Sequence, residues 1–478
     1  MTRVEQPPDR GHPAVRRWPA LAVGLIAAFM TLLDVSIVNV AVPSIQRALT
    51  ADPSALQWVL SGYALTFGLV LVPAGRYGDA RGRRGIFVLG LVLFTVASAS
   101  AGLARSAEWL IGARLVQGAA AGLVNPQVTG LIQQLFPAPV RGRPFGLLGA
   151  TIGVSTAVGP LLGGLLIQAA GPEQGWRWVF YVNIPVGLIA IVAAWRLLPA
   201  RGSSDREGVD PLGVTLLGVG LVCILLPLVQ REQWRGPAGW LLIPAGLGVL
   251  AGFVGWERRY GRRRTPVFDL TLFRLPSYTL GALIALIYFA GFTAIFFVFT
   301  IYLQNGLRYS ALAAGLTLTP FALGAAVASA LGGRVVNRLG RPLVAAGLAL
   351  VALGLGAVVA VLSLAPGHLS AVLAAPLAVA GIGSGLVITP NQTLTLAEVP
   401  VDRAGSAAGM LQTGQRVGAA IGIAGVGAVF FAGLTDGDYA AAVRTALLVT
   451  IGFVLVALLT ATVDSRLHGR QGKEEAPG

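Results

Sequence analysis

The sequence predicts an all-α integral membrane protein with fourteen transmembrane helices. Hydrophobic residues make up 55% of the 478 residues and charged residues only 12%, which is about half of the charged share in a water-soluble chain. Apolar segments recur from one end to the other, and each is close to the roughly 20 residues that a membrane-crossing helix needs. Basic residues gather in alternate loops, as cytoplasmic loops do.

Fourteen apolar segments have the required length. The first lacks a small-residue cleavage site, so we expect it to be a retained helix rather than a signal peptide. In chain order the predicted spans cover residues 18–41, 57–75, 86–104, 109–135, 144–168, 178–198, 211–230, 239–256, 277–303, 311–333, 342–363, 369–396, 404–432 and 440–463.

The positions of the arginines predict the orientation of these spans. On one side, the N-terminal tail and the loops after the second and eighth spans carry Arg3, Arg10, Arg16, Arg17, Arg76, Arg81, Arg83, Arg84, Arg258, Arg259, Arg262, Arg263, Arg264 and Arg274. Loops on the other side hold mostly single arginines. Because arginine-rich short loops stay in the cytoplasm, we expect both termini there, which agrees with an even number of spans.

An internal repeat predicts the domain organisation. The stretch "GRYGDARGRR" begins at Gly75 and "GRVVNRLGR" begins at Gly333, so that Asp79 aligns with Asn337. If these loops correspond, two parallel six-helix bundles flank an inserted helix pair, an arrangement that many secondary transporters use for alternating access. The expected divisions are a cytoplasmic tail at 1–17, bundles at 18–198 and 277–463, a two-helix insertion with its flanking loops at 199–276, and a cytoplasmic tail at 464–478.

Several function classes are excluded or disfavoured by composition. The net charge of +15 arises in loops between apolar segments, so we expect no nucleic-acid partner. The only lysine, Lys473, lies in the tail, which excludes an ATP-binding phosphate loop. The single cysteine, Cys223, is expected to be inert, and the isolated histidines suggest neither a metal site nor an enzyme. We therefore expect no cofactor and a proton gradient as the energy source.

Five motifs resemble the major facilitator superfamily, and within it the fourteen-helix drug:proton antiporters. "GRYGDARGRR" resembles the superfamily loop between helices 2 and 3, "LIGARLVQG" (110–118) the helix 4 signature with its buried arginine, and "GVSTAVGPLLGG" (153–164) the helix 5 antiporter signature. "LDVSIVNVAVP" (33–43) and "WRWVFYVNIPVG" (176–187) resemble stretches of the fourteen-helix branch. The resemblance covers almost the whole chain and implies a major facilitator fold and drug export.

Asp34 and Arg114 are the candidate proton-coupling residues. At about 1.5 Å per residue, Asp34 in the first span and Arg114 in the fourth lie at a shared depth in the membrane. An intramembrane charge faces the bundle or a wet cavity and finds a partner, so proton and substrate would compete at Asp34. A plain structural ion pair is the alternative. Gln117, on the same face as Arg114, and Asn39 are candidates for the substrate cavity.

Further candidates for the substrate cavity lie in the C-terminal bundle. Arg416, with Gln412 one turn before it, would contact a polar or anionic substrate or act in gating, or else hydrogen-bond its neighbours. Asn391 would contact the cavity or bond between helices. An aromatic stripe at helical spacing, of which the first three members are candidates for the cavity, would line a cavity for flat molecules, or face lipid or core; its members are Tyr288, Phe292, Phe296 and Phe299.

The remaining candidates form a conformational gate. We expect Asp79, in the loop after the second span, to cap a helix N-terminus in one conformation and release it in the other. Gly75, Gly78 and Arg83 belong to the same motif, although the arginines of this loop are equally explained by topology. In the fifth span, a bendable helix or simple close packing explains Gly159, Pro160 and Gly163.

These expectations combine into one predicted function. The chain is expected to be a monomeric, proton-coupled exporter of lipophilic drugs or antibiotics in the bacterial inner membrane, working by alternating access, with Asp34 as the coupling acid. Because Asp34 has no companion acid at depth in the tenth and thirteenth spans, we expect neutral, zwitterionic or monocationic substrates. The alternatives are a dedicated exporter of a metabolite, lipid or glycolipid and, less favoured, a nutrient importer.

Overall fold

The computed structural model describes residues 17–171, 173–199, 210–229, 237–262, 266, 268–364, 369–434 and 438–474. The helices in these ranges are α1 (Arg17–Leu49), α2 (Pro53–Arg81), α3 (Arg83–Gly102), α4 (Ala107–Leu135), α5 (Gly142–Ala170), α6 (Gly175–Tyr181), α7 (Asn183–Leu197), α8 (Pro211–Val229), α9 (Leu242–Tyr260), α10 (Pro276–Ile301), α11 (Ala311–Leu339), α12 (Arg341–Leu364), α13 (Leu369–Thr395), α14 (Ala404–Ala432) and α15 (Tyr439–Glu474). Short 3₁₀ or π turns lie at Ala138–Val140, Pro237–Leu241, Leu270–Arg274, Tyr302–Gly306 and Val401–Arg403. Most of the N-terminal tail and the last four residues lie outside the described ranges.

Each of the fourteen predicted segments is helical in the structure. Twelve of the helical stretches in the described ranges are long and apolar enough to cross a membrane. The other two segments are α4, which carries several buried polar side chains, and α8, a shorter apolar helix. The all-α fold is therefore confirmed, whereas the count of fourteen spans, the orientation and the domain divisions stay predictions.

The sixth predicted span is one stretch in the sequence but two helices in the structure. Val182 separates α6 from α7. Pro185 explains the break, because proline lacks the N–H that would bond to the carbonyl one turn earlier. The break places Asn183 at the first position of α7 and fully inside the protein, where it is 1% exposed.

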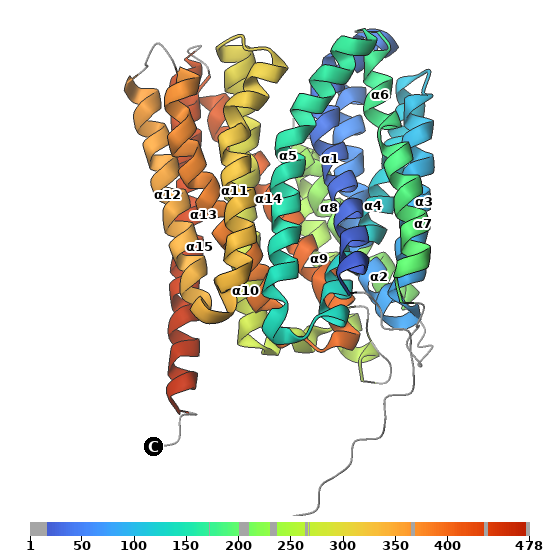
Figure 1. The fold of residues 1–478 in the computed structure, drawn as a ribbon, viewed down its shortest axis with the longest axis vertical. Helices are drawn as coiled ribbons and strands as arrows, with labels where there is room; N and C mark the ends of the chain where they lie inside the picture. Colours follow the sequence, from blue (N-terminus) through green and yellow to red (C-terminus); the bar gives the residue numbers. More distant parts are fainter. Residues whose placement is uncertain are drawn as a thin grey trace, which may run out of the picture.

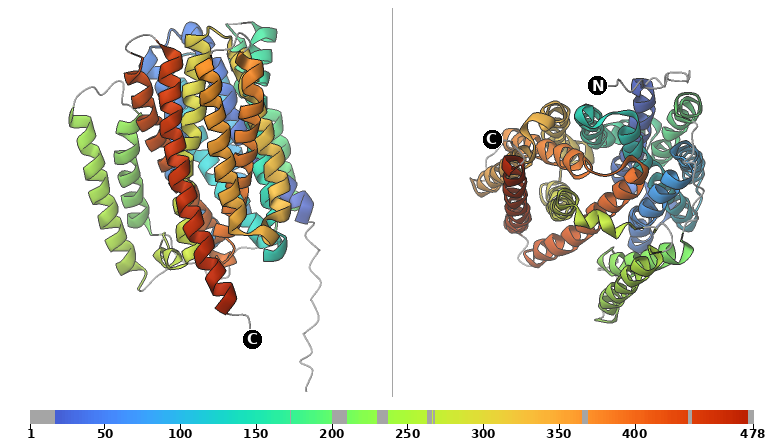
Figure 2. Two further views of the ribbon diagram at one scale, coloured as in Figure 1. Left: turned by 90° about the vertical axis from the view of Figure 1, so that its left-hand side faces the viewer. Right: turned by 90° about the horizontal axis from the view of Figure 1, so that it is seen from below.

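The long helices run side by side, with α1–α7 gathered on one side and α10–α15 on the other (Figure 1). We call these the N-terminal and C-terminal groups. The main contacts between them are α2 with α14 and α5 with α11. The pair α8 and α9 lies outside this bundle (Figure 2), with α8 against α2 and α14. The apolar clusters follow this division in part, since one is formed by the C-terminal group alone and another by the N-terminal group alone, whereas a third combines residues of both groups.

The repeated motif forms a sharp helix junction in both groups. Gly82 separates α2 from α3 with φ of 96°, and Gly340 separates α11 from α12 with φ of 60°. Residues with a side chain rarely adopt this backbone conformation, which explains glycine at both positions. Asp79 is therefore in the last turn of α2, and its predicted position in a loop is wrong, because the helix continues until Gly82 ends it.

Candidate functional site

Asp34 of α1 and Arg114 of α4 form an ion pair in the interior of the N-terminal group. Arg114 Nη1 donates to Asp34 Oδ2 at 2.5 Å, and the side chains are 2% and 0% exposed. The shared depth predicted from helix rise is therefore present in the fold. A buried carboxylate without a partner would be costly, and here the guanidinium compensates its charge.

Amide and hydroxyl groups complete the surroundings of the Asp34 carboxylate, and we call these residues with the ion pair the Asp34 cluster. Asp34 Oδ1 accepts hydrogen bonds from Gln117 Nε2 at 2.8 Å and Asn183 Nδ2 at 3.1 Å. Both amides also donate to Ser98 Oγ of α3. Residues of α1, α4 and α7 thus meet at one carboxylate that accepts three hydrogen bonds, and α3 adjoins them through Ser98.

Two aromatic rings of α2 join this cluster to the C-terminal group. The Arg114 guanidinium carbon lies 4.2 Å from the ring centre of Tyr63, which stacks on Phe67 with centroids 6.1 Å apart. On Phe67 lies the guanidinium of Arg416 from α14, at 4.3 Å. Two cations therefore flank one pair of stacked rings, an arrangement stabilised by the negative ring faces.

Sequence reasoning missed Asn183, Ser98, Tyr63 and Phe67 as members of this site. For Asn183 a signal was available, because an asparagine two residues before a proline inside an apolar span indicates a helix break with a polar group at depth. Ser98 and Tyr63 gave no such signal, since serine and tyrosine occur in many spans without any role. Only the fold brings them to Asp34.

The two amides predicted to line a cavity near Asp34 differ in their surroundings, and their role in a substrate cavity stays a prediction. Gln117 is 0% exposed and belongs to the Asp34 cluster, because it points between helices of its own group. Asn39 is exposed on α1. It lies five residues beyond Asp34, which turns it to another face of the helix.

Two members of the predicted aromatic stripe of α10 contact a phenylalanine of α11. Tyr288 is buried, and Phe292 and Phe296 are partly buried. The rings of Phe292 and Phe296 lie 5.3 Å apart, and both contact the ring of Phe321 in α11. The stripe therefore belongs largely to the core of the C-terminal group, and its predicted role in a substrate cavity stays a prediction.

The polar residues of α13 and α14 form contacts between helices. Asn391 Nδ2 donates to the carbonyl of Gly281 in α10 at 2.8 Å, which is the interhelical bond that was one of its two predicted roles. Gln412 Nε2 and Gln392 Nε2 both donate to Thr129 Oγ1 of α4, at 3.4 and 3.3 Å. Thr129 thus holds the C-terminal group to the N-terminal group near the repeated motif.

Asp79 holds the end of α2 to the start of α14. Its carboxylate accepts bonds from the backbone N–H of Ser406 at 2.7 Å and of Gly405 at 3.0 Å. It also pairs with Arg83 at 2.8 Å, and Arg83 donates to the carbonyl of Val401 at 2.7 Å. The predicted helix cap is therefore present, because a carboxylate is stabilised at a helix N-terminus.

The glycines of the motif permit this contact. A Cβ on Gly75 would lie 2.1 Å from the carbonyl oxygen of Gly405, and one on Gly78 would lie 1.9 Å from the side chain of Gln127 in α4. Because atoms cannot approach so closely, only glycine lets α2 meet α14 and α4 at these points. We call the contacts of Gly75, Gly78, Asp79 and Arg83 with α14 and α4 the Asp79 gate.

The glycines and proline of α5 pack against two helices. A Cβ on Gly159 would lie 2.3 Å from Ser36 Oγ, and one on Gly163 would lie 3.0 Å from Ile37, both in α1. On the other side, Pro160 lies against Gly315 of α11. The helix continues through Pro160 from Gly142 to Ala170. The close packing of these residues is therefore visible, and bending stays a prediction.

The second copy of the motif uses different partners for the same residues. Asn337, in the position of Asp79, donates its amide to the carbonyl of Pro139 next to α5. Arg341, in the position of Arg83, pairs with Asp464 of α15 at 2.7 Å, although Asp464 is distant in the sequence. A residue from the last helix thus supplies an acid to the repeat that has lost its own.

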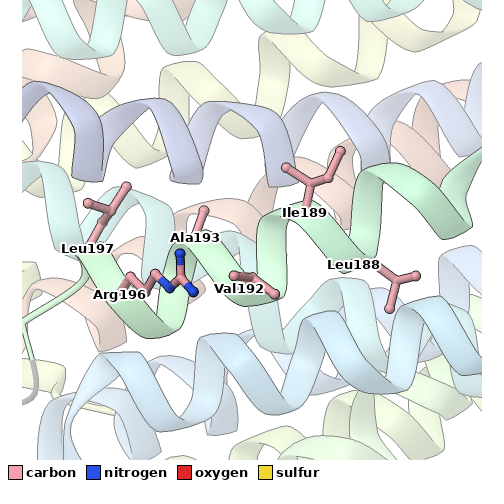
Figure 3. A pocket seen from close by; sticks show the side chains of 6 residues that line it. All are labelled: Leu188, Ile189, Val192, Ala193, Arg196 and Leu197. Atoms are coloured by element: carbon pink, nitrogen blue, oxygen red, sulfur yellow. The ribbon is translucent and has the colours of Figure 1, made fainter.

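The groove in Figure 3 lies on the outer surface of α7 and is separate from these sites. Its lining is Leu188, Ile189, Val192, Ala193, Arg196 and Leu197. Leu188, Ile189 and Val192 are more than half exposed. Such a face suits contact with lipid chains, whereas the Asp34 cluster lies inside the bundle.

Comparisons with known proteins agree on one family. The model of the Major Facilitator Superfamily matches residues 24–423. The chain is 38% identical to the "Probable actinorhodin transporter" of Streptomyces coelicolor, over 88% of this chain and 73% of that protein. It is 31% identical to the "Tetracenomycin C resistance and export protein" of Streptomyces glaucescens (89% and 78%) and 34% identical to the "Multidrug resistance protein Stp" of Mycobacterium tuberculosis (87% and 76%).

Solved structures share the fold at low sequence identity. The proton:xylose symporter XylE superposes with a TM-score of 0.67 at 15% identity, covering 94% of this chain and 95% of that one. The human organic anion transporter MFSD10 gives a TM-score of 0.64 at 16% identity, covering 94% and 100%. At this identity the likeness concerns the arrangement of helices and no more.

Proposed function

The chain belongs to the Major Facilitator Superfamily, and it is therefore a membrane transporter and not an enzyme. On this premise we propose that it exports lipophilic drugs or antibiotics in exchange for protons. The site of action would be the bacterial cytoplasmic membrane, where the chain would cross fourteen times as a member of the fourteen-helix drug:proton antiporter branch. Asp34 would take up the proton, and no ATP or cofactor would be needed.

The observation that carries this proposal is the buried ion pair of Asp34 and Arg114. In the arrangement described, the carboxylate receives hydrogen bonds from Arg114, Gln117 and Asn183. A proton on Asp34 would cancel its charge and leave Arg114 without a counter-ion, so the balance of contacts among α1, α4 and α7 would change. A buried acid in this position is the kind of group that carries protons in transporters.

The Asp79 gate supports an alternating-access cycle. Its contacts close the bundle at the end where α2 meets α14. If the arginine-rich loops are cytoplasmic, this end is the cytoplasmic one and the structure is closed to the cytoplasm. Opening would then require Asp79 to release the N-terminus of α14, after which a substrate could enter from the cytoplasm.

The names of the relatives support export of antibiotics over nutrient import. One is named for actinorhodin, one for resistance to and export of tetracenomycin C, and one for multidrug resistance. Two of the three names refer to a single compound. A dedicated exporter of one metabolite is therefore the second candidate, and the same Asp34 chemistry would serve it.

The test is a susceptibility panel in a bacterial host that lacks its own pumps. Wild type and Asp34→Asn would be compared at matched membrane expression against dyes, antibiotics and detergents. We expect protection by the wild type and none by Asp34→Asn, because asparagine cannot exchange a proton. The control is Glu108→Gln, which removes an exposed carboxylate and should leave protection unchanged. Protection by Asp34→Asn equal to that of the wild type would refute the coupling role.

A further inference from the structure

Arg416 is a cation near the middle of α14 without a counter-ion. It lies twelve residues after Ala404, so about 18 Å along the helix and near the middle of a bilayer. Within the described part of the chain it forms no ion pair and donates no hydrogen bond. Its guanidinium lies on the face of Phe67, and its aliphatic part lies against Gly68 of the same helix as Phe67. A charge at this depth normally finds a partner, so the arginine is available for a ligand.

The surroundings leave the guanidinium open on one side. Arg416 is partly exposed, and none of its nitrogen atoms is among the enclosed polar atoms that lack a partner. Those nitrogen atoms therefore keep accessible surface between the helices. One face of the guanidinium plane is covered by Phe67, while its edge carries N–H donors and no acceptor. Such an edge binds carboxylate or phenolate oxygen atoms in a fixed geometry.

The charges at this depth do not compensate Arg416. Asp34 is neutralised by Arg114, and the other carboxylates of the described helices lie near the ends of the spans. The central region therefore carries one excess positive charge. A cationic substrate would be repelled there, whereas an anionic group would restore neutrality.

We infer that Arg416 is the binding site for the acidic group of the substrate, and that the cargo carries an ionisable oxygen, a phenolate or a carboxylate. This inference rests on the proposed export function and names its substrate class. The acidic oxygen bonds to the edge of the guanidinium, on the side that Phe67 does not cover. Monocations, which the sequence led us to include, are disfavoured.

The same contacts explain how an acidic cargo is exchanged for protons. Arg416 reaches Phe67 only while α14 lies against α2, as in the closed gate. A proton on Asp34 removes the carboxylate that compensates Arg114, so two uncompensated arginines flank the rings of Tyr63 and Phe67, and separation of α2 from α14 is favoured. An anion on Arg416 has the opposite effect. Proton and substrate thus favour different conformations, which is the condition for exchange.

The test is equilibrium binding to the purified full chain, which does not depend on transport. The probes are fluorescein, an anion at alkaline pH, and a cationic rhodamine ester with the same xanthene ring. We expect the wild type to bind fluorescein in preference, and Arg416→Gln to weaken fluorescein binding about tenfold or more, because charge-assisted bonds are lost. Arg416→Lys should bind fluorescein with intermediate affinity. Binding of the rhodamine ester should not weaken in Arg416→Gln.

The control and the opposing outcomes separate this inference from the proposed function. Arg47→Gln removes an exposed arginine and should bind both probes as the wild type does, with an equal elution profile as evidence of folding. The inference is overturned if the wild type fails to bind fluorescein, or if Arg416→Gln leaves the ratio of the two affinities unchanged. A failure of the proposed export function appears instead in the Asp34→Asn panel, whatever the probes show.

Discussion

Two buried aspartate–arginine pairs differ in which helices they join. Asp34 and Arg114 lie in the N-terminal group, with α3 and α7 completing the site. Asp79 and Arg83 lie at the end of α2, but their remaining bonds go to α14 and the turn before it. The first pair therefore persists whether or not the two groups touch, whereas the second is complete only when they do. The same pair of side chains thus holds one group together in one place and joins two groups in another.

The largest expected effect is on the free energy of unfolding, and it concerns the pair of Asp34 and Arg114 inside the N-terminal group. Arg114→Ala leaves the Asp34 carboxylate buried without its counter-ion, so we expect the free energy of unfolding to fall by about 3–5 kcal/mol. Thermal unfolding in detergent would measure it. The double variant Asp34→Asn/Arg114→Ala should recover part of this loss, since no charge is then left unpaired. A double variant no more stable than Arg114→Ala would contradict the pairing as the source of stability.

The pair that joins the two groups should affect conformation more than stability. Asp79→Asn removes the charge that receives the N–H groups of Ser406 and Gly405, a loss of about 1.5–3 kcal/mol from the closed state. We expect the gate to open more often. The measurement is the rate at which a thiol reagent labels the cysteine of Thr129→Cys in a Cys223→Ser background, and Asp79→Asn should raise this rate about tenfold or more.

The matched control for Asp79→Asn is another aspartate–arginine pair. Asp269 pairs with Arg403. Asp269 lies just before the turn that leads into α10, and Arg403 lies in the turn that leads into α14. Asp269→Asn breaks an ion pair without removing a bond between the groups, so labelling of the cysteine at position 129 should stay near its starting rate. Equal labelling in the two variants would mean that Asp79 does not hold the gate.

The smallest effect should come from one hydrogen bond of the Asp34 cluster. Asn183→Ala removes one donor to Asp34 and leaves Arg114 in place, so we expect a loss of about 1–2 kcal/mol in unfolding free energy and slower export. Asn39→Ala, which removes an exposed amide of the same helix as Asp34, should leave the unfolding free energy at the wild-type value. Equal losses of unfolding free energy in the two variants would show that the hydrogen bond from Asn183 does not stabilise the Asp34 cluster.

The positions of the helices could be predicted because apolar length alone decides them. All fourteen predicted segments are helices, and most boundaries lie within a few residues. The errors share a cause, because hydropathy reports the part of a helix that suits lipid and not the helix itself. Thus α2 continues to Arg81 and α15 continues to Glu474, beyond their apolar parts. The break at Val182 was missed because the mean hydropathy of the whole stretch is high, although Asn183 and Pro185 beside it signal a helix break.

The candidate site could be predicted only in part. Asp34 and Arg114 are conspicuous because a charge in an apolar span is costly, and their depths follow from helix rise. Their neighbours Ser98 and Tyr63 carry no such cost and so give no signal. For Gln117 the helix face was right, yet the face turned out to be sealed between helices rather than open to a cavity.

By itself, the sequence determined that this chain is a bundle of membrane helices, that it carries a repeated motif, and that Asp34 and Arg114 share a depth, since these properties depend on composition, spacing and rise per residue. Only the tertiary structure decided the partners. It brought Asn183 to Asp34, Asp464 to Arg341 and Phe67 to Arg416. The physical reason is that rise fixes depth along a helix, whereas the azimuth of a side chain toward another helix depends on how all the helices pack.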